Sequence, residues 1–303
     1  MSKALLFAGQ GAQYVGMGED FFEYDVVKKI YAKAESVLGY DLKEICFTDS
    51  KGLLNITEYT QPAVFTTSVA ILSVLKEKGL SIDCVGGLSL GEYTALYVAG
   101  VFDFETGLKI VQARGKIMQS ICEVVSGTMM DIIGFDRDKL KSICDSVEGI
   151  VEIANYNCPG QLVIGGSIDA VSKAGELALA NGARRAIPLN VSGPFHTSIL
   201  SEASKQFAEF IKDISLNDPC KPVYMNVTGE VYNGSLKDLM SRQISNSVMF
   251  EDSIKEMVKT GVDTFIEVGP GKVLSGFVKK IDRGLNIINV DKLSDLEKVL
   301  ENI

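Results

Sequence analysis

Residues 83–99 read DCVGGLSLGEYTALYVA and contain the turn that decides the fold. A short apolar stretch runs into Gly87-Leu88-Ser89-Leu90-Gly91, and helix-forming residues follow from Glu92 to Ala99. Gly-x-Ser-x-Gly between a strand and a helix is typical of a nucleophile elbow, in which small flanking residues let a sharp turn expose a serine hydroxyl. A strand-to-helix turn without catalytic function is the alternative, because the five-residue pattern alone is weakly specific.

Strands and helices alternate on both sides of this turn. Lys3–Ala8 is expected to be a buried strand before a glycine-rich loop, and Thr60 is expected to be the N-cap of a helix with Pro62 in its first turn. Such alternation predicts an α/β fold with a mainly parallel sheet. Further helices are expected at 26–38, 60–79, 104–125, 198–214, 236–245 and 253–260, and further strands at 83–88 and 264–268.

The pattern changes between Thr128 and Leu189, where the order is strand, helix, two strands, helix, strand. Asn157-Cys158-Pro159-Gly160 favours a tight turn between the two middle strands. This order is typical of a ferredoxin-like fold and predicts a small inserted domain at 127–189, within a discontinuous large domain at 1–126 and 190–303. The expected elements are strands at 129–135, 151–156, 161–164 and 183–189 and helices at 138–147 and 168–180.

The composition argues against several classes of protein. The chain has 39 acidic and 30 basic residues, a net charge of −9, which is unlike a general nucleic-acid binder. Its apolar runs are far shorter than the ~18 residues that span a bilayer, so a cytoplasmic protein without a membrane segment is expected. Six dispersed cysteines without a Cys-x-x-Cys pair predict reduced, mostly buried thiols, and the single histidine argues against a zinc site.

Two glycine-rich loops resemble nucleotide-binding motifs but lack decisive residues. Gly9-Gln10-Gly11-Ala12-Gln13-Tyr14 has no third glycine for a dinucleotide, and Gly269-Pro270-Gly271-Lys272-Val273 has no Ser or Thr after its lysine. No nucleotide cofactor and no metal are therefore expected. The first loop lies between a strand and a helix, where it is suited to supply a backbone donor to an oxyanion hole.

His196, the only imidazole in the chain, lies at the end of Ser192-Gly193-Pro194-Phe195-His196. A serine hydroxyl is a poor nucleophile without an adjacent base, so His196 is the candidate base for Ser89. A structural histidine is the alternative.

Arg114 lies on the apolar stripe of the helix expected at 104–125. Its guanidinium is therefore expected to point inward, where an unpaired charge is unfavourable. An anionic partner is required, either the carboxylate of a ligand or, in a structural salt bridge, a carboxylate of the protein. The apolar neighbours three and four positions away are Ile110, Val111, Ile117 and Met118.

Six motifs, in order and at the expected spacing, resemble the malonyl-CoA:acyl carrier protein transacylase family from the first strand to about Lys280. The resemblance implies an α/β-hydrolase-like catalytic domain that transfers acyl groups between thiols. The motifs are Phe7-Ala8-Gly9-Gln10-Gly11-Ala12-Gln13, Gly87-Leu88-Ser89-Leu90-Gly91-Glu92-Tyr93, Gln112-Ala113-Arg114-Gly115, Asn155-Tyr156-Asn157-Cys158-Pro159-Gly160-Gln161, Gly193-Pro194-Phe195-His196 and Glu267-Val268-Gly269-Pro270-Gly271.

The same resemblance implies a ping-pong reaction in type II fatty acid synthesis. Ser89 takes the malonyl group from malonyl-CoA as an ester, and the phosphopantetheine thiol of an acidic acyl carrier protein receives it. His196 acts as base and then as acid, and Arg114 holds the malonyl carboxylate. A monomer without cofactor, nucleic-acid or membrane partner is expected. Other implied positions are the Gln10 and Leu90 amides in the oxyanion hole, the Gln243 carbonyl on the imidazole, and Gln61 and Asn155 lining the site.

The chain departs from the family at three positions. It has Leu88 where histidine is usual, Asp131 where a small apolar residue is usual, and Ser247 where proline is frequent. None of these changes removes an implied catalytic group. With Leu88 beside the serine, the base cannot be a flanking histidine.

Three other functions share parts of this pattern. A stand-alone acyltransferase of a polyketide synthase would use every residue named above. A hydrolase that clears stalled acyl groups would lose its acyl group rapidly to water. A non-catalytic domain that docks a carrier protein would have no need of Ser89, Arg114 and His196 together.

Overall fold

The computed structural model describes residues 2–300, which form two compact units. Within these residues, unit 1 comes from Met1–Lys116, Ser215–Tyr224 and Glu256–Ile303, and unit 2 from Ile117–Ile214 and Met225–Lys255. The domain boundaries after residues 126 and 189 stay a prediction. Each unit is described by itself below.

Unit 1 contains sheet A, whose four strands are parallel and follow the order β2-β1-β7-β8. Residues 4–7 in β1 are all buried, as is typical of a parallel strand covered on both faces. The prediction of a mixed α/β fold with a parallel sheet is confirmed. The strands are β1 (Ser2–Phe7), β2 (Cys84–Gly87), β7 (Val262–Val268) and β8 (Asn286–Val290).

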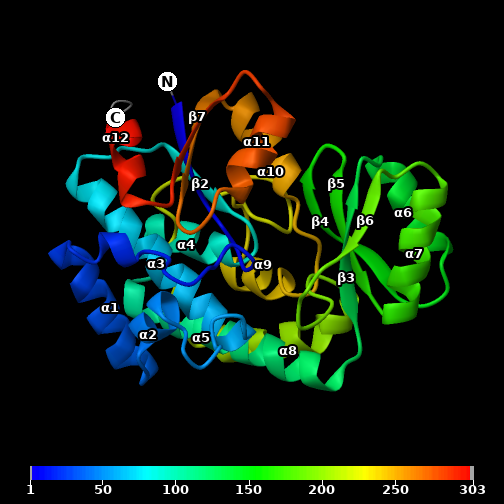
Figure 1. Cartoon of the computed structure of the whole chain (residues 1–303), viewed down its shortest axis with the longest axis horizontal. Helices are drawn as coiled ribbons and strands as arrows, with labels where there is room; N and C mark the ends of the chain where they lie inside the picture. Colours follow the sequence, from blue (N-terminus) through cyan, green and yellow to red (C-terminus); the bar gives the residue numbers. More distant parts are fainter. Residues whose placement is uncertain (1, 301–303) are drawn as a thin grey trace. The chain divides into compact units, whose positions relative to one another are not determined.

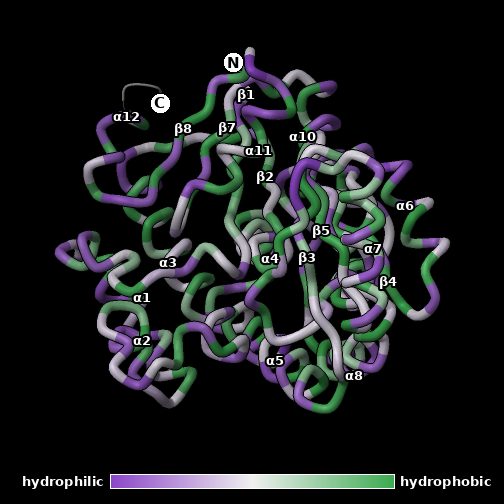
Figure 2. The backbone as a smooth tube through the Cα atoms, turned by 45° about the vertical axis from the view of Figure 1, so that its right-hand side comes forward, coloured by the Kyte–Doolittle hydropathy of each residue, from purple (hydrophilic) through white to green (hydrophobic). Residues whose placement is uncertain are grey.

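Helices cover this sheet, and their apolar faces follow the helical period. In α1, residues Val27, Tyr31, Ala34 and Leu38 are buried, and Figure 2 shows hydrophilic and hydrophobic residues alternating along this helix. Helix α5 begins in unit 1 and continues in unit 2. The helices are α1 (Asp25–Leu38), α2 (Leu42–Phe47), α3 (Thr57–Glu77), α4 (Leu90–Val98), α5 (Phe104–Val124), α11 (Val273–Ile281) and α12 (Leu296–Leu300), with short 3-10 turns at Glu19–Phe21 and Leu293–Asp295.

The start of α3 differs from the sequence-based expectation. The helix begins at Thr57 with Ile56 as its N-cap, so the assignment of Thr60 as the cap was wrong. The Thr60 hydroxyl instead donates to the carbonyl oxygens of Leu54 and Ile56. Thr60 therefore lies within the helix that it was expected to begin. Pro62 is consequently an interior residue rather than a first-turn residue.

Unit 2 contains sheet B, which is antiparallel with the strand order β4-β5-β3-β6. Helices α6 and α7 pack on one face of this sheet, as Figure 1 shows, and an apolar core that includes Leu140, Ile164 and Val171 fills the space between them. The predicted order of strands and helices is therefore present. The elements are β3 (Thr128–Ile133), α6 (Arg137–Ser146), β4 (Val151–Cys158), β5 (Gln161–Gly166), α7 (Ile168–Ala180), β6 (Arg185–Pro188), a 3-10 turn (Ser198–Leu200), α8 (Ser201–Ile211) and α9 (Leu236–Arg242), while α10 (Phe250–Lys259) is shared with unit 1.

Asp131 lies in β3, an inner strand of sheet B, and not at its edge. Its carboxylate accepts a hydrogen bond of 3.0 Å from the Gln161 side chain of the neighbouring strand β5. A polar residue is accommodated here because a cross-strand partner satisfies it.

All six cysteines carry thiols, and five of them are buried. Burial raises the pKa of Cys46, Cys84, Cys122 and Cys144 to about 12. Only Cys220 is exposed, so the expectation of mostly buried thiols is confirmed. Among residues 2–300, no helix is long and apolar enough to cross a membrane.

Candidate active site

Ser89 lies in a sharp turn between β2 and α4. It has φ 52° and ψ −104° and forms the N-cap of the helix. Positive φ is strained for a residue with a side chain, and it persists only where the surroundings enforce it. A Cβ on Gly87 would lie 2.1 Å from the Gly91 carbonyl carbon, and one on Gly91 would lie 1.9 Å from the Phe7 carbonyl oxygen. The two glycines of the motif therefore allow the close backbone approach that forms the turn.

The loop after β1 lies directly against this turn. A Cβ on Gly9 would be 2.3 Å from the Leu88 carbonyl oxygen. Gln10 follows in the same loop, and its side-chain amide donates to the Thr57 hydroxyl at 3.1 Å. Leu90 is the first residue of α4, where backbone N–H groups have no partner within the helix. The loop and the helix start can thus offer backbone donors to an oxyanion formed near Ser89.

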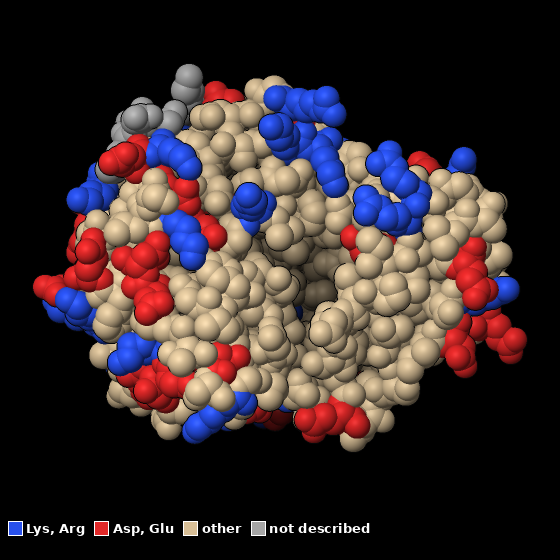
Figure 3. Space-filling view, viewed as in Figure 1, with Lys and Arg blue, Asp and Glu red and all other residues tan. Residues whose placement is uncertain are grey.

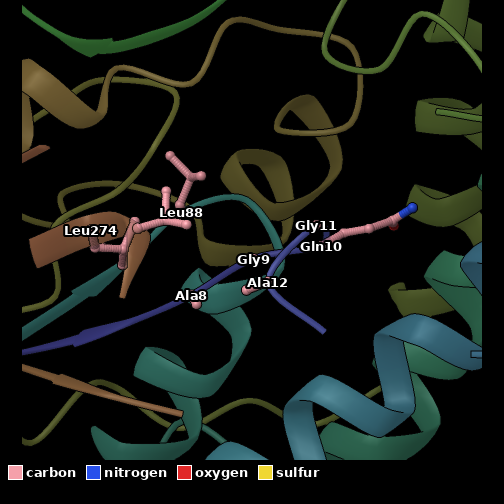
Figure 4. Close-up of a pocket in the computed structure, with 8 residues that line it drawn as sticks. Ala8, Gly9, Gln10, Gly11, Ala12, Leu88 and Leu274 are labelled. Atoms are coloured by element: carbon pink, nitrogen blue, oxygen red, sulfur yellow. The ribbon is translucent and has the colours of Figure 1, made fainter. Parts of the chain in front are cut away.

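A cavity of about 160 Å³ lies beside the turn in unit 1. Leu88 and Leu274 lie at one end, and the Gln10 side chain points away from them (Figure 4). Leu88 and Leu274 therefore make this wall apolar. The lining residues are Ala8, Gly9, Gln10, Gly11, Ala12, Leu88, Val273 and Leu274.

Arg114 is buried in unit 1 with its guanidinium directed at the serine. Its side chain is 1% exposed, which confirms the inward orientation. Nη1 donates to Gln61 Oε1 at 2.8 Å, and Nη2 donates to Ser89 Oγ at 3.1 Å. Helix α5 approaches α3 closely here, because a Cβ on Gly115 would be 2.9 Å from the Thr57 carbonyl oxygen. The neighbouring glycine thereby brings Arg114 within reach of Gln61.

The electrostatics of Arg114 reflect its burial. Burial lowers the pKa of Arg114, and the nearby Tyr93 hydroxyl and Glu92 carboxyl group oppose that shift. Glu92 is a fully buried acid in the first turn of α4. The side chains that accept the two Nη hydrogen bonds, Gln61 and Ser89, are uncharged. A desolvated cation therefore lies in hydrogen-bond contact with the candidate nucleophile.

His196 lies in unit 2 with its imidazole fixed by backbone carbonyls. Its Nδ1 is 2.7 Å from the carbonyl oxygen of Gln243, and its backbone N–H donates to Ile244. A carbonyl oxygen can only accept, so Nδ1 carries the proton and Nε2 is left as the basic nitrogen. His196 has φ 60°. The Thr197 hydroxyl donates to the Pro194 carbonyl at 2.6 Å and thereby stabilises the loop on both sides of His196.

The segment that carries Gln243 is attached to β4. Asn155 pairs with Val248 in a parallel bridge, and the Ser247 hydroxyl donates to the Ile153 carbonyl at 2.6 Å. Ser247 therefore contributes a side-chain hydrogen bond to this attachment. The Asn155 side chain is 8% exposed.

The structure brings the sequence-predicted residues together in two groups. In unit 1, Ser89, Arg114 and Gln61 are in direct contact, with Gln10 and Leu90 beside them. In unit 2, His196 contacts Gln243, and Asn155 lies on the strand next to the Gln243 segment. Among the described residues, no cluster of three or more His, Cys, Asp or Glu side chains could hold a metal ion.

Sequence reasoning missed Tyr93. Its ring is fully buried, and the ring centroid lies 5.1 Å from Arg114 Cζ. A signal was present, because Tyr93 follows Ser89 by four residues at the start of a helix and so shares its face.

Comparison with known proteins identifies the family. Residues 4–289 match the family described as Acyl transferase domain. The malonyl CoA-acyl carrier protein transacylase of Bacillus subtilis (strain 168) is 41% identical over 310 residues, which cover 100% of this chain and 98% of that protein. The crystal structure of malonyl CoA-acyl carrier protein transacylase from Clostridium perfringens is 44% identical, has a TM-score of 0.96 and covers 100% of this chain and 97% of that one.

A third relative was solved together with its partner, as a type II PKS acyl-carrier protein in complex with its malonyl-transacylase. It is 37% identical, has a TM-score of 0.96 and covers 100% of both chains. The matches extend over the whole chain. The chain therefore belongs to the acyl transferase domain family and, within it, to the malonyl CoA-acyl carrier protein transacylases.

Proposed function

We propose that the chain transfers the malonyl group of malonyl-CoA to the phosphopantetheine thiol of an acyl carrier protein, through an ester on Ser89. The choice of a malonyl group rests on one observation, which is that Arg114 Nη2 lies 3.1 Å from Ser89 Oγ. A buried cation beside the nucleophile favours an acyl group that carries its own carboxylate. A malonyl group has that carboxylate, whereas an acetyl group does not.

In the first half-reaction, Ser89 Oγ attacks the thioester carbonyl carbon of malonyl-CoA. His196 Nε2 takes the hydroxyl proton, and the backbone N–H groups of Gln10 and Leu90 stabilise the tetrahedral oxyanion. Collapse of the intermediate breaks the carbon–sulfur bond. The departing thiolate takes the proton back from His196 and leaves as coenzyme A, so that malonyl-Ser89 remains.

In the second half-reaction, the phosphopantetheine thiol gives its proton to His196 and attacks the ester carbonyl. Collapse now breaks the bond to Ser89 Oγ, which recovers the proton from the imidazolium. The Gln243 carbonyl supports both steps, because its contact with Nδ1 holds the tautomer and stabilises the imidazolium in the place of a carboxylate. Gln61 orients the guanidinium, and Asn155 is assigned to the wall of the site.

Two finer assignments of the fold belong to the same proposal. We assign sheet A and its helices to an α/β-hydrolase-like core, which the strand-turn-helix at Ser89 supports. We assign 127–189 to a ferredoxin-like subdomain, which the strand order β4-β5-β3-β6 supports.

The test is intact-protein mass spectrometry after mixing with malonyl-CoA. The expected result is a malonyl adduct on Ser89, none in Ser89→Ala, and loss of the adduct when a phosphopantetheinylated carrier protein is added. Rapid loss of the adduct to water without an acceptor would favour the hydrolase instead. Absence of any adduct on the folded, unaltered protein would overturn the proposal.

A polyketide pathway is the second candidate, because the relative solved with its carrier is a type II PKS protein. Rates of discharge to fatty-acid and polyketide carrier proteins, measured side by side, decide between the two pathways. A clear preference for the polyketide carrier would assign the chain to that pathway.

The proposed contacts for an acidic carrier protein are Arg184 and Arg185 in unit 2, and Lys272, Lys279 and Lys280 at or within α11 in unit 1. Lys272, Lys279 and Lys280 are exposed at or within this helix, and Figure 3 shows Lys and Arg side chains gathered on the face where α11 lies. Opposite charges raise association rates at low ionic strength. The kcat/KM for the carrier should therefore fall between low and physiological salt, and a flat profile would contradict this assignment.

A further inference from the structure

The ring of Tyr93 packs against the cation that the proposed function uses. Tyr93 lies in α4, four residues after Ser89, so the two residues share one face of the helix start. The distance from Arg114 Cζ to the ring centroid is 5.1 Å, within the range of a cation–π interaction. Both side chains are buried, at 0% and 1% exposure. Desolvation strengthens such a contact because water no longer competes for the cation.

The Tyr93 hydroxyl also interacts with the guanidinium. Burial raises the pKa of Tyr93, and the charge of Arg114 and a hydrogen bond from it act in the opposite direction. Arg114 is thus held by groups from three positions. Gln61 on α3 accepts from Nη1, Ser89 accepts from Nη2, and Tyr93 on α4 contacts the guanidinium with its ring and its hydroxyl.

This arrangement matters for an acyl group with a carboxylate. A guanidinium can bind a carboxylate through two parallel hydrogen bonds only if its plane has the correct orientation. The hydrogen bond that Nη1 donates to Gln61 does not by itself fix the plane of the guanidinium. A buried aromatic ring restricts that rotation and leaves the donor edge of the guanidinium available to a ligand.

We propose that Tyr93 is a positioning residue that determines the preference for malonyl over acetyl groups, by orienting Arg114. The inference rests on the proposed function. Tyr93 acts through Arg114, so its loss affects only acyl groups whose carboxylate needs the guanidinium. Acetyl transfer uses the same serine and oxyanion donors but no carboxylate contact, and it is expected to be insensitive.

The test compares kcat/KM for ester formation on Ser89 from malonyl-CoA and from acetyl-CoA. Tyr93→Leu removes the ring and the hydroxyl, and the malonyl-to-acetyl ratio is expected to fall roughly 5- to 30-fold. Tyr93→Phe keeps the ring and removes the hydroxyl, so a smaller fall in the same direction is expected. Acetyl transfer should stay within about twofold of the unaltered protein in both variants. A change of that size corresponds to the few tenths of a kcal/mol within which the effects of independent substitutions add.

Tyr97→Leu is the matched control. Tyr97 lies one turn further along α4, and its ring packs against Phe65 and lies 5.8 Å from the Lys76 ammonium group. This variant also removes an aromatic ring and a cation contact from α4, yet the ring is not part of the Arg114 environment described above. Its melting temperature should fall while the ratio stays unchanged.

Equal losses on both acyl donors in the Tyr93 variants would show a structural role only and would overturn the inference. If Tyr93→Leu does not fold, Tyr93→Met, which also lacks the ring, takes its place, and an unchanged ratio in that variant overturns the inference. Failure of the unaltered protein to form a malonyl ester would overturn the proposed function and this inference with it. Malonyl transfer with an unchanged ratio in the variants overturns only the inference.

Discussion

Ser89 and His196 both have a positive φ, yet different interactions hold the two residues. Among residues 2–300, only three residues other than glycine have positive φ, and these are Asp49 at 47°, Ser89 at 52° and His196 at 60°. Around Ser89 the main chain itself leaves no space, because Gly87 and Gly91 have backbone atoms where a Cβ would lie. Around His196 the contacts are hydrogen bonds, including those of its Nδ1 and its backbone N–H to two successive carbonyls.

This difference between the two sites predicts which substitutions affect folding and which affect catalysis. A turn enforced by backbone packing cannot change without moving β1, β2 and α4 together, so errors there affect the whole of unit 1. A loop held by individual hydrogen bonds loses about 1 kcal/mol for each bond removed, and the rest of the loop persists. We therefore expect substitutions near Ser89 to affect folding and substitutions near His196 to affect mainly activity.

The largest effect is expected from Gly91→Ala. Its Cβ would be 1.9 Å from the Phe7 carbonyl oxygen, so the elbow cannot form without backbone movement. The free energy of unfolding should fall by about 3 kcal/mol or more. Gly276→Ala is the control, because this glycine also lies in a helix but has nothing within 4 Å of its Cβ position. Equal melting temperatures for the two variants would contradict the account of the turn.

His196→Asn should abolish most of the activity and leave the fold intact. Asn is chosen because it tolerates positive φ better than Ala. Without the imidazole base, acyl transfer should fall by on the order of 10² to 10⁴. Activity is measured alongside the melting temperature, which should change little. Unchanged turnover in the folded variant would show that another group activates Ser89.

Arg114→Ala should lower the rate of malonyl transfer without lowering that of acetyl transfer. Malonyl transfer is expected to lose roughly 2 to 4 kcal/mol of transition-state binding, while acetyl transfer is unchanged or improved. Arg137→Ala is the control, since Arg137 pairs with Asp252 through two hydrogen bonds of 2.9 and 3.2 Å and packs on the Tyr156 ring. That variant should lower the melting temperature without changing the ratio of the two activities. Loss of both activities and of stability in Arg114→Ala would favour the structural salt bridge.

The smallest effect is expected from Ser247→Ala. It removes the 2.6 Å hydrogen bond to the Ile153 carbonyl, which helps to hold the Gln243 segment against β4. Stability should fall by about 1 kcal/mol, and transfer should decline slightly because the imidazole loses support. Ser146→Ala, which removes an exposed hydrogen bond to Ile143 at the end of α6, provides the reference. A fall in stability no larger than that of the reference would show that Ser247 does not hold the segment.

Much of this structure could be predicted from the sequence, because the decisive signals are local. The glycines around Ser89 predict the turn, and the apolar stripe around Arg114 predicts its burial. Alternation of strands and helices predicts the parallel sheet. These features depend on residue type and spacing over less than about two helical turns.

Features that depend on distant contacts could not be predicted in this way. Helix α3 begins at Thr57, where its backbone lies close to Gly115 on α5, and the local capping signal at Thr60 does not reveal this tertiary contact. The short helix α2 has a cap, since Asp41 accepts from the Glu44 N–H, but six residues show too little periodicity to be recognised. The Gln243 contact is made by a backbone carbonyl, which every residue has, so only the family resemblance indicated it.

Each unit contains buried cysteine thiols, so alkylation of these thiols reports when that unit unfolds. At neutral pH an alkylating reagent should modify the exposed Cys220 first, because the other five thiols are buried and out of its reach. Cys46 and Cys84 belong to unit 1, whereas Cys122, Cys144 and Cys158 belong to unit 2. Each of these five becomes reactive only when its surroundings open. The order in which the corresponding peptides become alkylated in rising denaturant therefore tells which unit opens first.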